Sequence, residues 1–207
     1  MRQATVAPSG ALSLRKRTAT VRKAPLSWKL RNFPNYWRGA WRVWLAQRFG
    51  IATHYGDLRL RVLHGDGSVT DYGLVSRRVV TDTGVAFIVD AFQNLVELEN
   101  LKFHGFGTGA GAEAVGNTAL STELTTEYAT DNVRPTGSTT EAAANIYRSV
   151  GTLDPDAAVA ITEHGIFSQA ATGGGTLLDK TLFSAINLAA AGDTLEATYD
   201  LTLTSGS

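Results

Sequence analysis

The four histidines are the first residues of this sequence that could do chemistry. No two of them have the i, i+4 or His-x-His spacing with which transition metals are usually bound. His104 and His164 share a context, because each is followed by a glycine and an apolar residue. If they met across a sheet they would form a ligand pair or an acid–base pair. Half-buried histidines with hydrogen-bond partners are more common, and we favour that interpretation for all four. The histidines are His54, His64, His104 and His164.

A carboxylate, an imidazole and a hydroxyl also occur near one another, as in serine hydrolases. Glu163 and His164 are adjacent, and Ser168 or Ser149 would be the nucleophile. Adjacent residues of a strand point to opposite faces, so Glu163 could not orient His164. The sequence also has no G-x-S-x-G nucleophile motif. We therefore predict no catalytic residues and no enzymatic activity.

Cofactor and metal sites are not indicated either. The glycine-rich segment GFGTGAG at 105–111 lacks the βαβ context of a dinucleotide site and the lysine of a phosphate-binding loop, so it predicts a turn. The absence of cysteine excludes disulfides and thiolate metal sites. Two carboxylate groups lie close in sequence, but neither has EF-hand spacing, so we predict no metal ion. These groups are Asp154 with Asp156 and Glu163, and Asp66 with Asp71.

The most informative residues are tryptophans and arginines near the N-terminus. All four tryptophans lie between positions 28 and 44. Within residues 35–49 the large apolar residues recur at spacings of 4, 3, 1 and 4, which predicts one face of a short amphipathic helix. Asn35 could cap its start and Gly50 its end, while Gly39 would weaken it by roughly 1 kcal/mol. The residues on this face are Trp37, Trp41, Trp44, Leu45 and Phe49.

Charge is distributed unevenly, although the chain as a whole is neutral. Residues 1–61 contain thirteen Lys or Arg and one acid, Asp57, which gives +12. Residues 62–207 contain six basic and eighteen acidic residues, which gives −12. Such an asymmetry concerns partners rather than fold. The basic segment could bind nucleic acid, an anionic membrane or an acidic protein surface, including the acidic part of a neighbouring copy.

The Trp/Arg stretch therefore has several possible roles. Arginine interleaved with aromatic residues can bind single-stranded nucleic acid, and a basic amphipathic helix can lie in a membrane interface. Tryptophan and arginine are also enriched at protein–protein hot spots, and a tryptophan face can simply pack on the protein's own core. We favour a partner interface made of Trp28, Arg31, Trp37, Arg38, Trp41, Arg42, Trp44, Arg48 and Phe49.

Two regions follow from these patterns. Residues 1–34 lack periodicity and contain three of the five prolines, which predicts an extended arm that becomes ordered against a partner. The arm and the amphipathic helix together make an N-terminal region, residues 1–50, followed by a β-rich domain, residues 51–207. No apolar run reaches the roughly 18–20 residues of a transmembrane helix, and no secretory signal is present, so we expect no membrane association.

The β-rich domain begins with a hairpin and a helix. Residues 57–76 alternate on both sides of a glycine turn and predict the hairpin. Residues 83–95 place apolar side chains on one helical face, with Thr81 or Thr83 as the cap. These elements form the predicted subregion 51–100.

The remainder, residues 101–207, predicts the core of a sandwich. A strand at 102–109 enters the glycine turn, and 114–124 is a short helical turn or loop. Short strands separated by turns predict a mainly-β protein, an antiparallel β-sandwich or jelly-roll-like domain with one or two helices and an extended N-terminal arm. The further predicted strands are 125–133, 145–153, 157–163, 164–169, 176–183 and 194–203.

Three segments of this remainder carry a resemblance. They are FGTGAGAEAVGNTALSTEL at 106–124, ITEHGIFSQAATGGGTLLDKTLF at 161–183 and INLAAAGDTLEATYDLTL at 186–203. In this order they resemble a group of tailed-bacteriophage virion proteins that are described as tail-fibre-like or capsid-decorating. The resemblance covers about residues 105–203 and rests on glycine turns and strands. It implies a structural protein of the virion.

We therefore expect a capsid decoration, or cement, protein that clamps major capsid subunits through its N-terminal arm. A homotrimer on the capsid surface is the favoured assembly. A tail component, such as a short fibre, tip or adaptor, is the alternative, because the resemblance allows it equally. A nucleic-acid-binding module is the third possibility.

Overall fold

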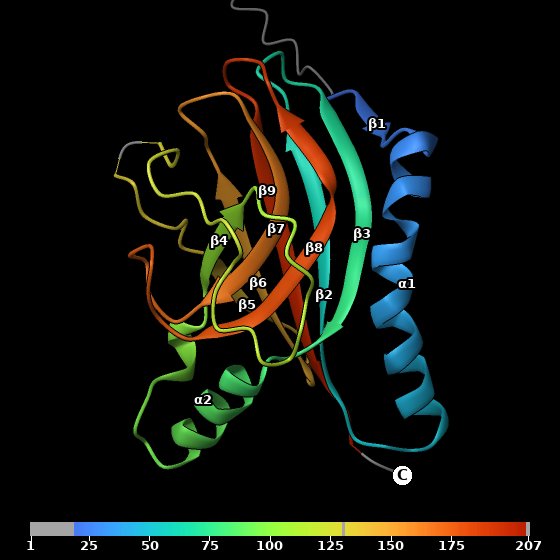
Figure 1. Cartoon of the computed structure of the whole chain (residues 1–207), viewed down its shortest axis with the longest axis vertical. Coiled ribbons are helices and arrows are strands. Elements are labelled where there is room, and N and C mark those ends of the chain that lie inside the picture. Colours follow the sequence, from blue (N-terminus) through green and yellow to red (C-terminus); the bar gives the residue numbers. More distant parts are fainter. Residues whose placement is uncertain (1–18, 130, 206–207) are drawn as a thin grey trace, which may run out of the picture.

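The computed structural model describes residues 19–129 and 131–205, which form two facing β-sheets with helices at their margins (Figure 1). The larger sheet has the strand order β1-β3-β2-β9-β6-β5, and the smaller has the order β4-β7-β8. The predicted fold class, a mainly-β sandwich, is confirmed. Residues 1–18 of the predicted arm lie outside the described part. The elements are β1 (Val21–Lys23), α1 (Leu26–Arg48), β2 (His54–Leu63), β3 (Val69–Val79), α2 (Asp82–Phe92), a short 3-10 helix η1 (Leu98–Asn100), β4 (Phe103–Gly107), β5 (Ser138–Ala143), β6 (Ile146–Leu153), β7 (Val159–Phe167), β8 (Leu177–Leu188) and β9 (Thr194–Leu203).

The predicted hairpin is present as β2 and β3, which pair antiparallel from Tyr55–Val79 to Leu63–Val69. The full length of β2 also pairs with β9, the C-terminal strand. The hairpin is therefore a central part of the larger sheet, and the predicted subregions 51–100 and 101–207 share one core. This follows from burial, because the inward-facing residues of β2 need a second sheet to cover them.

Other strand predictions need correction. The segments 157–163 and 164–169 form one continuous strand, β7, because Gly165 sits in register with its neighbours instead of making a turn. Within the predicted strand 125–133, the described residues 125–129 and 131–133 form no strand and make one isolated bridge, from Tyr128 to Pro155. Strand β5 was not expected, because its residues are exposed and show no apolar alternation.

The N-terminal helix is longer than the sequence predicts. It begins after Pro25 and continues through Pro34, so residues 26–34 are helical rather than extended, and Asn35 is not its cap. Its end is as predicted, because Gly50 adopts a φ of 67°. The N–H of Gly50 donates to the Gln47 carbonyl at 3.2 Å and that of Ile51 to Ala46 at 2.9 Å, which is the Schellman ending.

Helix α1 closes the open side of the sandwich by bridging the edges of β3 and β8. The Asn32 amide donates to the Val75 carbonyl at 2.8 Å and accepts the Ser184 N–H at 2.9 Å. The Trp28 indole N–H lies 3.0 Å from the carbonyls of Ser184 and Ala185. These bonds satisfy exposed strand edges, and they stabilise the helix enough to tolerate an internal proline, which costs about 3 kcal/mol.

Gly39 allows the helix to lie directly on β3. A Cβ built at Gly39 would overlap the carbonyl oxygen of Arg77, which belongs to the strand backbone and cannot turn aside as a side chain can. The glycine that weakens the helix in isolation is thus required where helix and strand meet.

We predict that Gly39→Ala destabilises the protein although alanine favours an isolated helix by about 1 kcal/mol. Overpacking against the Arg77 carbonyl should lower the free energy of unfolding by about 1–3 kcal/mol, measured by chemical denaturation. Gly116→Ala is the control, because a Cβ there meets no atom within 4 Å. Equal or higher stability of Gly39→Ala would contradict the close approach.

Candidate functional site

A row of aromatic side chains runs along the outer face of α1. Phe33, Trp37, Trp41 and Trp44 follow one another at helical spacing, and we call them the aromatic ladder. Successive ring centroids are 5.9, 6.1 and 5.0 Å apart, with interplanar angles of 17°, 28° and 20°. The rings therefore stack into one continuous surface.

The ladder is exposed rather than packed on the domain. Its four side chains have exposed fractions of 45–56%. Leu26 and Leu30 extend the same apolar row toward the start of the helix, and both are exposed. Tryptophans at this level of exposure are unusual on a monomer surface, and contiguous apolar patches of this kind mark interaction sites.

Phe49 is a further exposed apolar residue at the C-terminal end of the helix. It caps α1 and is 73% exposed, and Ile51 beside it in sequence is 57% exposed. The predicted helical face thus lies at the surface over its whole length, except that Leu45 is half-buried.

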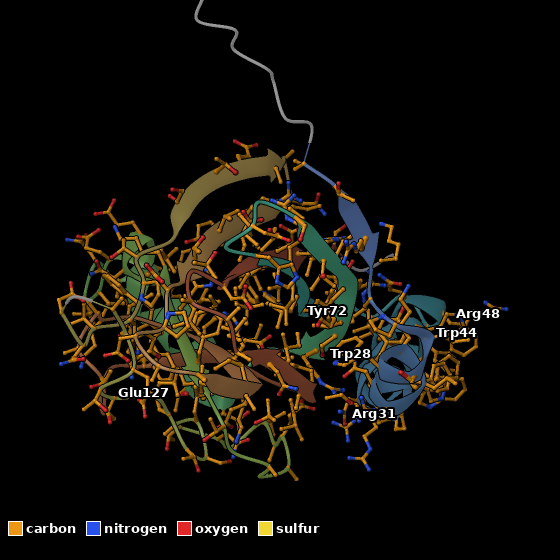
Figure 2. All side chains as sticks on the ribbon, turned by 90° about the horizontal axis from the view of Figure 1, so that it is seen from above. Trp28, Arg31, Trp44, Arg48, Tyr72 and Glu127 are labelled. Carbon is orange, nitrogen blue, oxygen red and sulfur yellow. The ribbon has the colours of Figure 1, made fainter. Side chains whose placement is uncertain are left out.

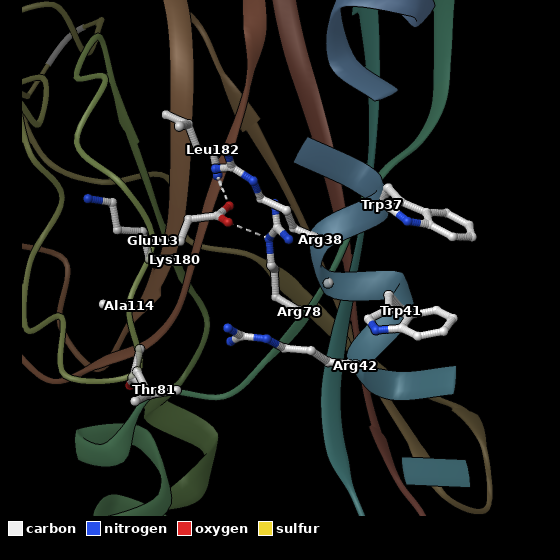
Figure 3. A pocket seen from close by; sticks show the side chains of 12 residues that line it. Trp37, Arg38, Trp41, Arg42, Arg78, Thr81, Glu113, Ala114, Lys180 and Leu182 are labelled. Atoms are coloured by element: carbon white, nitrogen blue, oxygen red, sulfur yellow. Dashed lines mark hydrogen bonds and ion pairs between the residues drawn. The ribbon is translucent and has the colours of Figure 1, made fainter. Parts of the chain in front are cut away.

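The basic residues of α1 lie partly beside the ladder and partly on the flank away from it. Arg38 and Arg42 point to the flank opposite Trp37 and Trp41 (Figure 3). Figure 2 shows Arg48 beside Trp44 on the side of α1 that faces away from the sheets. Helix α1 carries five Lys or Arg and no acid. An apolar centre with a charged rim is the usual composition of a protein interface.

Trp28 does not belong to this surface, which corrects the sequence prediction. Its ring is 5% exposed and meets Tyr72 edge-on at 4.7 Å (Figure 2). Together with its indole hydrogen bonds to β8, this packing makes Trp28 part of the core. Arg31 is exposed, as predicted for the interface, but lies away from Trp44 and Arg48 (Figure 2).

The sequence missed Phe33 and the two leucines as parts of the apolar row. Phe33 precedes Trp37 by one helical turn, which is the signal that could have found it. Pro34 suggested that the helix starts later, so residues before it were assigned to the arm.

A cleft of about 350 Å³ lies between α1 and the loop that carries Glu113 (Figure 3). Arg38 and Arg42 form one wall, and Arg78, Glu113 and Lys180 form the other. Glu113 pairs with Arg78 at 2.6 Å. Burial raises the pKa of Glu113, although Arg78 opposes this shift.

Behind the cleft lies a carboxyl that is fully buried. Asp179 accepts the Thr181 hydroxyl at 3.1 Å and is 3.4 Å from the Tyr199 hydroxyl. Burial and the nearby Glu113 carboxylate raise the pKa of Asp179 to about 7. A strongly shifted pKa marks functional sites and also buried structural groups, and the complete burial of Asp179 favours a structural role.

The two histidines of similar context do meet. His104 Nδ1 lies 3.0 Å from His164 Nε2, and His104 Nε2 lies 2.9 Å from Ser149 Oγ. All three are buried, and none lines the cleft between α1 and the Glu113 loop. Burial lowers the pKa of His104 to about 3 and that of His164 well below its usual value, so both rings are neutral. This row of hydrogen bonds from His164 through His104 to Ser149 satisfies polar side chains inside the sandwich.

Glu163 serves the loop rather than His164. Its carboxylate accepts backbone N–H groups of Gly109, Ser121 and Thr122 at 3.2, 3.0 and 2.7 Å, and Lys180 lies 3.4 Å away. The motif segments at 106–124 and 161–183 therefore meet at a structural contact.

Neither helix of residues 19–129 and 131–205 combines the length and apolar character that crossing a membrane requires. In the same residues, no three His, Asp or Glu side chains are grouped to hold a metal ion. No protein-family model matches the sequence, and no curated protein is significantly similar to it.

We predict a specific pH effect at Asp179. Its neutral form contributes stability that is fully present below about pH 4 and is lost as the pH rises toward 7. Asp179→Asn lacks this loss, so its stability relative to the wild type should increase from pH 4 to pH 7, by at most about 1.4 kcal/mol per pH unit. Denaturation at several pH values measures the difference. A difference that stays constant across this range would show that Asp179 is ionised throughout.

Proposed function

We propose that the chain is a structural, non-catalytic protein of a tailed-phage virion, with a capsid decoration subunit as the favoured role. The outer face of α1 is its assembly surface, where it binds other protein subunits of the particle, either the major capsid protein or further copies of itself. The observation that carries this proposal is the exposed aromatic ladder on a helix whose inner face is fixed to the domain.

The size of the ladder suits a protein partner. An aromatic side chain carries 150–250 Å², so four half-exposed rings leave roughly 400 Å² of apolar surface. A stable interface uses about 800 Å² per partner, of which the ladder would supply about half. Burying 400 Å² is worth about 10 kcal/mol before the costs of association are subtracted, whereas exposed ion pairs give only about 0–1 kcal/mol each.

The stacking of the ladder rings on one another also favours a protein partner over nucleic acid. The rings of the ladder stack on one another, so their faces are occupied, whereas single-stranded bases bind by stacking on free aromatic faces. A continuous ridge of stacked rings fits a preformed groove.

The virion assignment rests on the resemblance at residues 105–203. In a symmetric particle each contact is repeated, so a modest interface becomes strong through avidity. A trimer is the favoured assembly. A tail fibre, tip or adaptor is the second candidate, because the same motifs resemble tail proteins, and the number of copies per particle distinguishes the two.

We predict that the triple variant Trp37→Ala/Trp41→Ala/Trp44→Ala folds but no longer joins particles. The three side chains are about half exposed, so removing them should change the free energy of unfolding little and reduce incorporation at least tenfold. Incorporation is measured by quantitative gel analysis of virions that are assembled with the variant as the sole copy.

The matched control replaces the same tryptophans by phenylalanine, which keeps an aromatic ridge and should retain most of the incorporation. Leu203→Ala, at an exposed apolar residue of β9, controls for the loss of any surface apolar group. Wild-type incorporation of the alanine variant would show that the ladder is not the assembly surface.

A further inference from the structure

Helix α2 presents a second apolar face to solvent. Phe87 is buried and Ile88 packs against the same cluster, so these residues seat the helix on the domain. Another side of α2 carries three large apolar residues with exposed fractions of 46–84%, and the segment that follows, up to the start of η1, adds two more at 67% and 44%. We call this surface the α2 patch, and its apolar residues are Val85, Val89, Phe92, Leu95 and Leu98.

The α2 patch is acidic, whereas α1 is basic. Residues 82–99 contain four acids and no Lys or Arg, and α1 contains five Lys or Arg and no acid. None of the ion pairs within the described residues involves a charged side chain from either segment. Both surfaces are thus apolar, and the segments that carry them have opposite charge. The acids of the patch are Asp82, Asp90, Glu97 and Glu99.

The two surfaces cannot meet within one chain. Helix α1 lies along β3 at one side of the sandwich, and α2 lies at the lower end toward the other side (Figure 1). The C-terminal half of α1, which carries Trp41 and Trp44, lies at the same end of the long axis as α2 (Figure 1). The two helices therefore lie at a similar height along this axis, so a neighbouring copy can bring its α2 level with the ladder.

We infer that the outer face of α1 binds the α2 patch of a second copy of this chain. This inference rests on the proposed function, because it names the partner of the same assembly surface. The contact is head-to-tail, so each copy uses both surfaces, and the assembly is a ring where the rotation between successive copies closes. The aromatic ladder packs on the apolar residues of the patch, with Arg48 beside Trp44 at the contact, and the net positive charge of α1 is set against the net negative charge of residues 82–99.

Charge reversal and restoration in the full-length chain test this contact. The first variant, Arg38→Glu/Arg42→Glu/Arg48→Glu, reverses α1, and the second, Asp90→Lys/Glu97→Lys/Glu99→Lys, reverses the patch. Like charges across the interface oppose association, so each variant should raise the Kd of self-association at least 100-fold. The chain with all six substitutions should recover the wild-type oligomer with a Kd within about tenfold. Sedimentation and light scattering over a concentration series measure these values.

Phe92→Ala supplies a variant with little risk to folding, because this ring is 84% exposed. It should weaken self-association at least tenfold with an unchanged thermal melting curve. A second control, Asp154→Lys/Asp156→Lys, reverses exposed acids outside the patch and should leave the oligomer intact.

A wild-type chain that stays monomeric at about 100 µM, or an oligomer that is indifferent to both reversals, would overturn the inference. If self-association fails these tests while Trp37→Ala/Trp41→Ala/Trp44→Ala still fails to join particles, the proposed function stands and the partner is another virion subunit. If the six-substitution chain restores the oligomer while the tryptophan variant joins particles normally, the self-contact stands and the role of the ladder in the virion fails.

Discussion

The bridge that α1 makes between the edges of β3 and β8 is the interaction on which the rest of the structure depends. Asn32 serves an acceptor on one sheet and a donor on the other with a single amide. Without it, backbone groups at both edges would lose partners at a buried site, and each such loss costs about 1–3 kcal/mol. The same bridge sets which side of the helix faces solvent. Because Trp28 and Asn32 point inward, the residues of the aromatic ladder point outward.

A helix that is fixed in this way differs from an arm that becomes ordered only on binding. Ordering a free segment costs about 1–2 kcal/mol per residue, which would consume most of what a few aromatic contacts contribute. In residues 26–48 the inner hydrogen bonds, the close approach at Gly39 and the Schellman ending already determine the conformation. The ladder is thus preorganised, and more of its burial energy is available for binding.

The sequence predicted what depends on local pattern and missed what depends on distant contacts. The alternation at 194–203 located β9, and Gly50 located the end of α1, because both signals are local. The start of α1 was missed because Pro34 normally ends a helix, and only hydrogen bonds to residues about 150 positions away compensate for it. Nothing local distinguishes the buried Trp28 from the exposed Trp37. The meeting of His104 and His164 was considered from their similar contexts. Ser149 was considered only as a nucleophile beside His164, whereas it lies on the facing sheet and hydrogen-bonds His104.

The charge asymmetry of the sequence has a partial explanation within the fold. Strand β2 carries basic residues that pair with acids of β9, as Arg59 does with Asp200 and Arg61 with Glu196, so part of the positive N-terminal charge is balanced by strand register alone. This mechanism requires that the two segments be neighbours in a sheet. Helix α1 meets the domain with an inner face of Trp, Asn and Gly, so its basic residues have no acid of a neighbouring strand beside them. Arg48 lies beside Trp44, whereas Arg38 and Arg42 line the cleft on the other flank. Binding of this surface to an uncharged apolar partner costs free energy, because each arginine needs an acid or water beside it in the complex. If the outer face of α1 is the assembly surface, as proposed, this positive charge favours an acidic partner surface over an uncharged apolar one.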